Sequence, residues 1–106
     1  MSTITYNKLV RDRIPEIIEK ENKRCEIRIL DDAEYLEKID AKLDEEIAEY
    51  HKDQNLEELA DVLEVIYAAT KARGYSIAEL EEVRAKKAEK RGAFEEKIFL
   101  ERVCDD

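Results

Sequence analysis

The chain has 106 residues, of which 44% are charged and 43% hydrophobic, and its formal net charge at pH 7 is -9. This apolar content excludes a disordered tail, and the acidic charge argues against a nucleic-acid backbone as partner, because that binding needs clustered Lys and Arg. The first residues lack the apolar core of a secretory leader, and no apolar run approaches a membrane span of about 20 residues. We therefore expect one cytoplasmic domain, residues 1–106, with no membrane partner.

The N-terminal part predicts a helix followed by a strand. Two glycines and one proline provide few of the turns that an all-β fold needs, so long helices are expected. Asp12 is predicted to cap a first helix that runs to about Lys23, with Pro15 in its opening turn. Residues 25–30 alternate apolar and charged side chains, which is typical of a half-buried strand.

A pair of longer helices is predicted next. Asp31 or Asp32 can cap a second helix that runs to about Lys52, with an apolar stripe at helical spacing. A short linker leads to a third helix, and Gly74 is expected to end it in a left-handed conformation. Because the linker is short, these two helices should form an antiparallel hairpin.

The C-terminal part predicts a fourth helix and a second strand. Ser76 and Glu79 match a capping box, which opens a helix that runs to about Arg91. Gly92 ends that helix, and residues 97–103 alternate well enough to form a strand. The expected fold is thus mainly α, a helical bundle of about four helices with a small two-stranded β accessory.

The two cysteines raise a separate question, because Cys25 and Cys104 would come close together if the strands at 25–30 and 97–103 paired antiparallel. Their spacing does not match a zinc site or a disulfide scaffold. Reduced structural thiols are therefore the main expectation, and a disulfide between them stays open as an alternative.

Four acids on the second and third helices are expected to meet, namely Glu46, Glu49, Glu58 and Asp61. Each pair is three residues apart and shares a helix face, and the hairpin brings the two pairs together beside apolar surface. Like charges there repel unless they are protonated or neutralised, which a divalent cation would achieve. Oxygen ligands without His or Cys favour Mg²⁺ or Mn²⁺. The alternative is a solvated acidic face, since the chain has 28 acids.

Three stretches resemble a known family. "EEIAE" at Glu45–Glu49 followed by "ELAD" at Glu58–Asp61 resembles the E-E-x-x-E and E-x-x-D pattern of the all-α nucleoside triphosphate pyrophosphohydrolases, the MazG-like and phosphoribosyl-ATP pyrophosphohydrolase-like superfamily. "YNKLVRDRIPEII" at 6–18 and "KRGAFEEKIFLE" at 90–101 are similar to a small single-domain branch of it. The resemblance implies hydrolysis between the α and β phosphates of a nucleotide, in nucleotide-pool house-cleaning. A phosphoribosyl-ATP substrate is less favoured.

The same resemblance implies roles for the acids. It assigns a set of Mg²⁺ ligands, with Mn²⁺ as the alternative ion, consisting of Glu46, Glu49, Glu58 and Asp61. A bound divalent ion can stabilise charge on phosphate oxygens and activate a water. Glu45 is the candidate that orients or deprotonates this water, and the alternative is an ordinary surface residue.

Two basic clusters could hold an anionic nucleoside triphosphate. One precedes the first helix and the other lies at the end of the fourth, and together they contribute the substrate-binding candidates Lys8, Arg11, Arg13, Lys87 and Arg91. Arg can grip phosphate oxygens in pairs, and Lys supplies a movable charge. For the second cluster, a favourable interaction with the helix C-terminus is the alternative.

Assembly and function class have further alternatives. The third helix carries two nearly opposite apolar stripes, and superfamily members usually complete their sites in oligomers, so a homodimer or larger homo-oligomer is expected. A non-catalytic metal-binding or regulatory module would respond to Mg²⁺ without releasing pyrophosphate. A helical interaction protein would not respond to Mg²⁺ at all.

Overall fold

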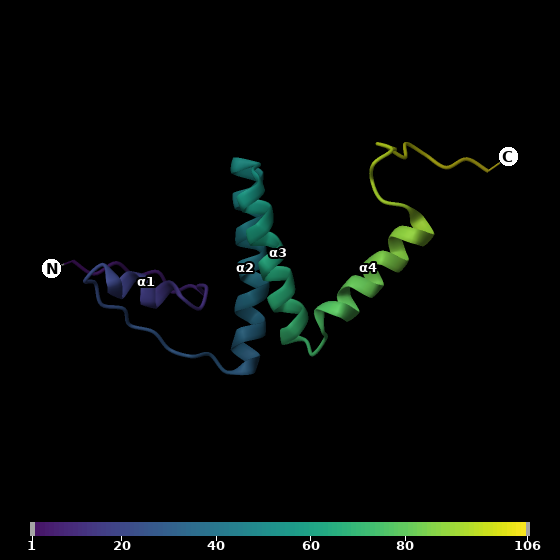
Figure 1. The fold of residues 1–106 in the computed structure, drawn as a ribbon. Helices are drawn as coiled ribbons and strands as arrows, with labels where there is room; N and C mark the ends of the chain where they lie inside the picture. The colour runs from purple at the N-terminus through teal and green to yellow at the C-terminus, as the bar shows by residue number, and fades with distance from the viewer. Residues whose placement is uncertain (1, 106) are drawn as a thin grey trace. The chain divides into compact units, whose positions relative to one another are not determined.

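The computed structural model describes residues 2–105, and in this range it holds four α-helices and no β-strand (Figure 1). None of these helices is long and apolar enough to cross a membrane. The chain divides into two compact units, one ending at Tyr75 and the other beginning at Ser76. The mainly-α prediction is confirmed, and the helices are α1 (Ile14–Lys20), α2 (Asp32–Asp53), α3 (Leu56–Ala72) and α4 (Ile77–Arg91).

The predicted β accessory is wrong. Within the described range, residues 25–30 and 97–103 form neither helix nor strand. Their apolar side chains are not covered, since Ile29 is 88% exposed and Ile98 is 81% exposed. Alternation predicts only that one face of a segment suits burial, whereas a strand also needs a neighbouring backbone to complete its ladder of hydrogen bonds. Alternation of side chains does not supply that neighbouring backbone.

The thiols do not pair. Cys25 is half-buried, with its Sγ 3.9 Å from the carbonyl oxygen of Pro15, and Cys104 is exposed. Both are free. The disulfide alternative depended on paired strands, which are not seen in the described residues.

The first helix is shorter than predicted. It begins at Ile14 rather than at an Asp12 cap, and the residue before Ile14 makes no side-chain capping hydrogen bond. Pro15 lies in the first turn as predicted, where its missing N–H costs the helix no hydrogen bond. The helix ends at Lys20, because Asn22 turns the chain with a left-handed φ of 62°.

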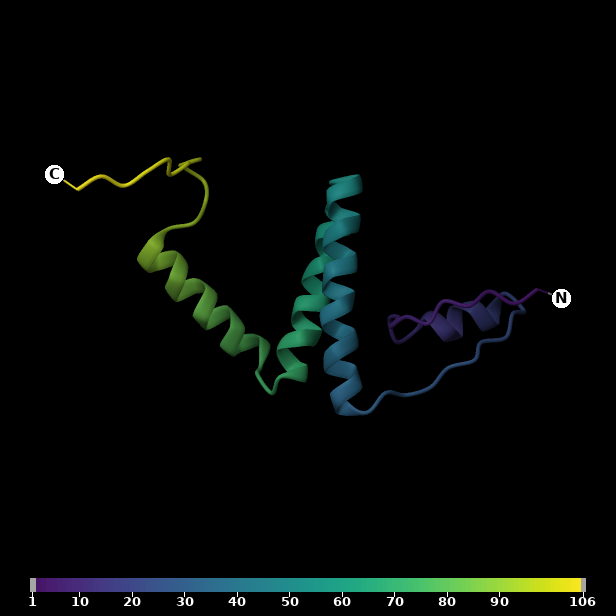
Figure 2. The same cartoon turned by 180° about the vertical axis from the view of Figure 1, so that it is seen from behind.

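Helices α2 and α3 form an antiparallel hairpin, and they lie side by side in both views of the molecule (Figures 1 and 2). The Asp31 side chain accepts a hydrogen bond from the Glu34 amide, which confirms one of the two predicted caps. Gln54 adopts a left-handed φ of 50°, and Asn55 then caps α3 by accepting from the Glu58 amide. This two-residue connection places the end of α2 beside the start of α3.

The hairpin buries a narrow strip between its helices. Ile39 on α2 is 3% exposed and Val65 on α3 is 8% exposed, and these are the buried hydrophobic residues among those described. Other apolar side chains of the two helices stay open to solvent: Ile47 is 37% exposed, and Leu59 and Leu63 are each 46% exposed. One hairpin therefore leaves apolar surface on the side of α3 that carries these leucines.

The ends of α3 and α4 follow the predicted signals. Gly74 adopts a left-handed φ of 89°, and its amide donates to the carbonyl of Lys71. Ser76 and Glu79 form the reciprocal capping box, with both hydrogen bonds at 3.0 Å. These short-range signals were sufficient because each helix end is decided within a few residues.

Candidate metal centre

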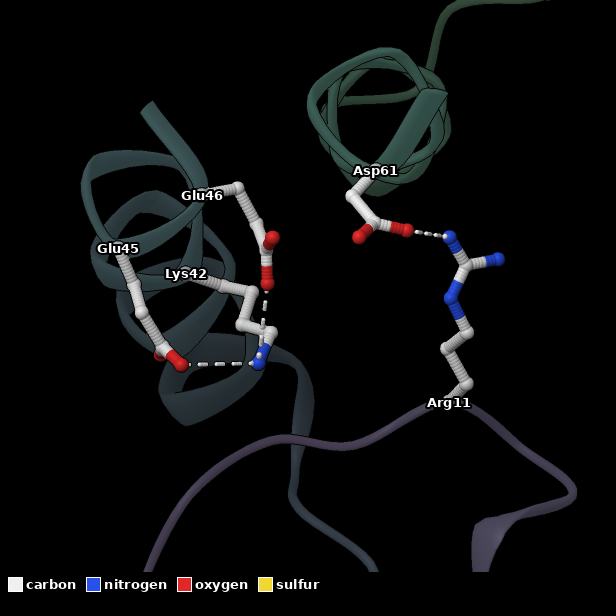
Figure 3. A network of polar contacts seen from close by, with 5 residues as sticks. All are labelled: Arg11, Lys42, Glu45, Glu46 and Asp61. Atoms are coloured by element: carbon white, nitrogen blue, oxygen red, sulfur yellow. Dashed lines mark hydrogen bonds and ion pairs between the residues drawn. The ribbon is translucent and has the colours of Figure 1, made fainter. Parts of the chain in front are cut away.

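Three carboxylates from facing helices converge on one side of the hairpin. Glu46 lies on α2, and Glu58 and Asp61 lie one turn apart on α3. One oxygen from each carboxylate lies within 4.8 Å of the others, and all three residues are half-buried. Figure 3 shows Glu46 and Asp61 pointing toward each other across the gap between the helices. The convergence follows from i, i+3 spacing on α3 and from the short connection between the helices.

Glu49, the fourth predicted ligand, belongs to an overlapping group. Its carboxylate lies with those of Asp53 and Glu58, again within 4.8 Å of one another. The predicted ligands thus form two groups that share Glu58, rather than a single set of four. Asp53 is absent from the sequence-based set, although its position four residues after Glu49 on the same helix face would have indicated it.

Glu58 lies at the centre of this negative charge. Burial raises the pKa of the Glu58 carboxyl above its ordinary value, and the charges of Asp61, Asp53, Glu49 and Glu46 raise it further. When the Glu58 carboxyl is ionised, it is repelled by these neighbouring carboxylates. Either a proton or a cation would relieve that repulsion.

Two basic side chains already contact the other acids (Figure 3). Lys42 Nζ lies 3.4 Å from Glu46 and 3.3 Å from Glu45, and the Lys42 side chain is only 17% exposed. Arg11 Nη2 lies 2.6 Å from Asp61 Oδ1. Lys42 was not predicted, although its positions three and four residues before these glutamates are a usual signal for ion pairs on a helix.

Glu45, the candidate for activating water, lies beside the cluster. It is exposed, and its carboxylate accepts a hydrogen bond from the same Lys42 ammonium that contacts Glu46. Lys42 therefore links Glu45 to the convergent carboxylates.

The remaining predicted basic residues have other surroundings. Arg13 lies 3.9 Å from Glu16, and the Lys8 ammonium lies 5.7 Å from the centre of the Tyr6 ring. Lys87 and Arg91 are exposed residues of α4, in the second unit. Of the five substrate-binding candidates, the structure brings Arg11 into contact with a predicted metal ligand.

The donor set fits a hard divalent cation. Every side chain in the two groups offers carboxylate oxygen, and neither group contains His or Cys, which suits Mg²⁺ or Mn²⁺ rather than zinc or copper. Octahedral Mg²⁺ with oxygens at about 2.1 Å separates its ligands by roughly 3 to 4 Å. The Glu46, Glu58 and Asp61 oxygens lie within 4.8 Å of one another, which is of the same order.

Comparison with known proteins adds one partial match. A protein of Mycolicibacterium smegmatis (strain ATCC 700084 / mc(2)155), described as an uncharacterized protein, is 58% identical to this chain over 41 residues. The matched residues are 39% of this chain and 42% of that protein, so the chain spans less than half of the relative's length. No protein-family model matches the chain, and no solved structure does.

Proposed function

We propose that the chain is a Mg²⁺-dependent nucleoside triphosphate pyrophosphohydrolase, which cleaves between the α and β phosphates and releases a nucleoside monophosphate and pyrophosphate. The observation that supports this best is the convergence of Glu46, Glu58 and Asp61, because these residues occupy the positions of the E-E-x-x-E and E-x-x-D pattern. The resemblance adds a nucleotide-pool house-cleaning role and membership of the all-α superfamily, and the cytoplasm is the proposed location.

The acids have distinct proposed roles. Glu46, Glu58 and Asp61 hold the ion, and Glu49 supports it from the adjoining group with Asp53. When bound, Mg²⁺ supplies positive charge to phosphate oxygens at the scissile bond. Glu45 orients the attacking water and accepts its proton, and Lys42 keeps this carboxylate beside the cluster.

Arg11 has a proposed role in both the free and the substrate-bound protein. In the structure it neutralises Asp61 from 2.6 Å, with the Arg11 side chain 57% exposed. When Asp61 binds a cation instead, the guanidinium becomes available to grip phosphate oxygens in pairs. Lys8 and Arg13, in the same unit as the cluster, remain proposed as further contacts to the triphosphate.

The proposed assembly is a homodimer. On α3, Leu59 and Leu63 lie roughly 160° from Asp61 at 100° per residue, so they face away from the carboxylates. Two hairpins that pack through these exposed leucines would form the dimer interface, with a carboxylate cluster on each outer side.

The proposal is tested by products. The protein is incubated with Mg²⁺ and a panel of ordinary and modified nucleoside triphosphates together with phosphoribosyl-ATP, and pyrophosphate, monophosphate and inorganic phosphate are quantified. We expect pyrophosphate and monophosphate in equal amounts, and their loss in Glu58→Gln and Asp61→Asn. Glu57→Gln is the matched control, because this exposed neighbour lies outside both acid groups. Release of inorganic phosphate instead, or no product from correctly folded protein, would overturn the proposal.

A helical interaction protein is the second candidate. It is favoured by the ion pairs of Lys42 with Glu46 and of Arg11 with Asp61, which neutralise two of the three convergent acids without a metal. This candidate predicts that Mg²⁺ does not change thermal stability. A non-catalytic metal-binding or regulatory module predicts Mg²⁺-dependent stabilisation without pyrophosphate release.

A further inference from the structure

A hollow of about 540 Å³ opens between α2, α3 and the segment before α1, all within the first unit. Its apolar lining consists of the half-buried Tyr35 on α2 and of Ala68 and Ala72 on α3. The alanines have no side chain beyond Cβ, so an open apolar surface lies near an aromatic ring. The volume falls within the range of small-molecule sites, about 300 to 1,000 Å³.

The hollow lies on the same face of the hairpin as the carboxylates. Ala68 and Ala72 follow Asp61 by seven and eleven residues, which puts all three within about 20° of one direction on α3. On α2, Tyr35 has the same relation to Lys42 and Glu46. Seven residues of helix span about 10 Å, so the hollow begins where a nucleotide held by its phosphates at the cluster would place its base.

The segment before α1 is a second observation that relates the carboxylate cluster to the hollow. Arg11 contacts Asp61 in the cluster, and its neighbour Asp12 lines the hollow. One stretch of chain therefore borders both the proposed phosphate end and the hollow.

The polar lining of the hollow indicates which bases it would select. It contains three exposed carboxylates, Asp12, Asp32 and Glu64, and one ammonium, Lys71. Ionised carboxylates only accept hydrogen bonds, whereas an ammonium only donates them. The lining thus has more accepting than donating groups, and it favours the base with more N–H donors: an exocyclic amine presents two, whereas uracil and hypoxanthine present a single ring N–H. The flat face of such a base can stack on an aromatic side chain.

We infer that this hollow is the nucleoside subsite of the proposed enzyme and selects bases with an exocyclic amine, namely guanine, adenine and cytosine, over uracil and hypoxanthine. The inference rests on the proposed function, since the phosphates are placed at the carboxylate cluster. Tyr35 stacks on the base, Ala68 and Ala72 leave room for it, and Glu64 accepts from its amine.

The first arm of the test measures binding without catalysis. The full chain, labelled with ¹⁵N, is titrated with cytidine, uridine, guanosine and inosine in the absence of Mg²⁺. We expect shifts at the amides of Tyr35, Ala68 and Ala72, and affinity roughly tenfold higher for cytidine than for uridine and for guanosine than for inosine. Absence of binding by any nucleoside, or shifts confined to other residues, would overturn the inference.

Variants separate filling of the hollow from general effects. Ala68→Leu fills the hollow and should weaken nucleoside binding about tenfold, while Ala48→Leu, at an exposed position of α2 outside it, should not. If Ala68→Leu does not fold, Tyr35→Ala removes the stacking surface instead. Glu64→Gln should keep binding but remove the preference for amine-bearing bases. Wild-type affinity and preference in all three variants would overturn the inference.

The second arm measures pyrophosphate release with Mg²⁺, so that the two proposals fail differently. We expect kcat/KM for CTP to exceed that for UTP, with KM raised in Ala68→Leu. Nucleoside binding in the hollow without pyrophosphate from any triphosphate would refute the enzyme and keep the subsite. Pyrophosphate release with KM and base preference unchanged by Ala68→Leu and Tyr35→Ala would refute the subsite and keep the enzyme.

Discussion

Replacing Glu58 by Gln tests the charge arrangement directly, because Glu58 is the residue shared by both acid groups. Gln keeps the size of the side chain. It also keeps the N-terminal cap of α3, since Asn55 accepts from the Glu58 backbone amide and not from its side chain. The substitution therefore removes one negative charge from the centre of the cluster and leaves the local backbone unchanged.

The size of the Mg²⁺ response follows from linkage. A cation at about 100 times its Kd stabilises the folded protein by about 2.7 kcal/mol, which for a domain of this length raises Tm by roughly 10 to 20 °C. We expect this rise for the wild type and for the exposed control Glu57→Gln. In Glu58→Gln both groups lose the negative charge of the ligand they share, and the neutral amide oxygen that replaces it is a weaker donor, so the rise should fall to within about 3 °C of zero at the same Mg²⁺ concentration.

The pH dependence without metal has a definite sign. Because burial and the neighbouring acids raise the pKa of Glu58, the folded protein binds this proton more tightly than the unfolded chain does. The resulting stabilisation is complete below the unfolded Glu pKa of about 4.3 and is lost as pH rises through the raised folded value. Glu58→Gln should therefore be more stable than wild type at neutral pH, and this advantage should vanish below about pH 4.

Calorimetric scans across pH, with EDTA or with Mg²⁺, measure both effects. Equal Mg²⁺-induced shifts in wild type and Glu58→Gln would refute the view that these carboxylates hold the ion. A Glu58→Gln variant that is less stable than wild type at pH 7 without metal would refute the argument from repulsion.

Two further substitutions test the hairpin and the basic residue beside it. Ile39→Ala should lower the unfolding free energy by about 2 kcal/mol, the low end for a buried Ile, because its half-open neighbours can relax. Ile17→Ala, at a 51% exposed position, should lower it by less than about 0.5 kcal/mol. Urea titration measures both losses, and equal losses would contradict the assigned core. Arg11→Gln removes the guanidinium that pairs with Asp61, so Mg²⁺ no longer has to displace it. Because an exposed ion pair contributes about 0 to 1 kcal/mol, Mg²⁺ should bind more tightly, with its Kd lowered by up to about fivefold. Calorimetric Mg²⁺ titration measures this against Arg13→Gln, and a higher Kd in Arg11→Gln would contradict it.

Helix ends were predictable where the deciding residues are close in sequence. The capping box of Ser76 and Glu79 and the left-handed Gly74 each depend on fewer than five residues, and both formed as expected. The strands at 25–30 and 97–103 depend on a distant pairing partner, which alternation of side chains does not encode. The missed end of α1 shows the same limit, because Asn22 can continue a helix or turn the chain, and its sequence neighbourhood does not decide between them.

Part of the candidate site was also predictable, because several of its residues lie close together in sequence. The spacing of Glu58 and Asp61 fixes a shared face on α3, and the two-residue connection brings Glu46 opposite. Lys42 and Asp53 lie within the same periodic helix, so i, i+4 spacing was available to find them. The contact between Arg11 and Asp61 was not accessible, because the path of the segment before α1 follows no helical or strand period.

A single substitution among the exposed leucines of α3 can test the proposed dimer. Leu59 and Leu63 are each 46% exposed and Ile47 on α2 is 37% exposed, so a second hairpin that covers them would bury apolar area worth about 25 cal/mol per Å². A charge in the centre of that interface would lose solvation without gaining a partner. Leu63→Glu should therefore convert a dimer into single chains of 12.5 kDa by light scattering, with helical content retained, while Ala41→Glu at an exposed position of α2 leaves the mass unchanged. A wild type that already has the mass of one chain, with full activity, would refute the dimer, and the exposed leucines would then need another explanation.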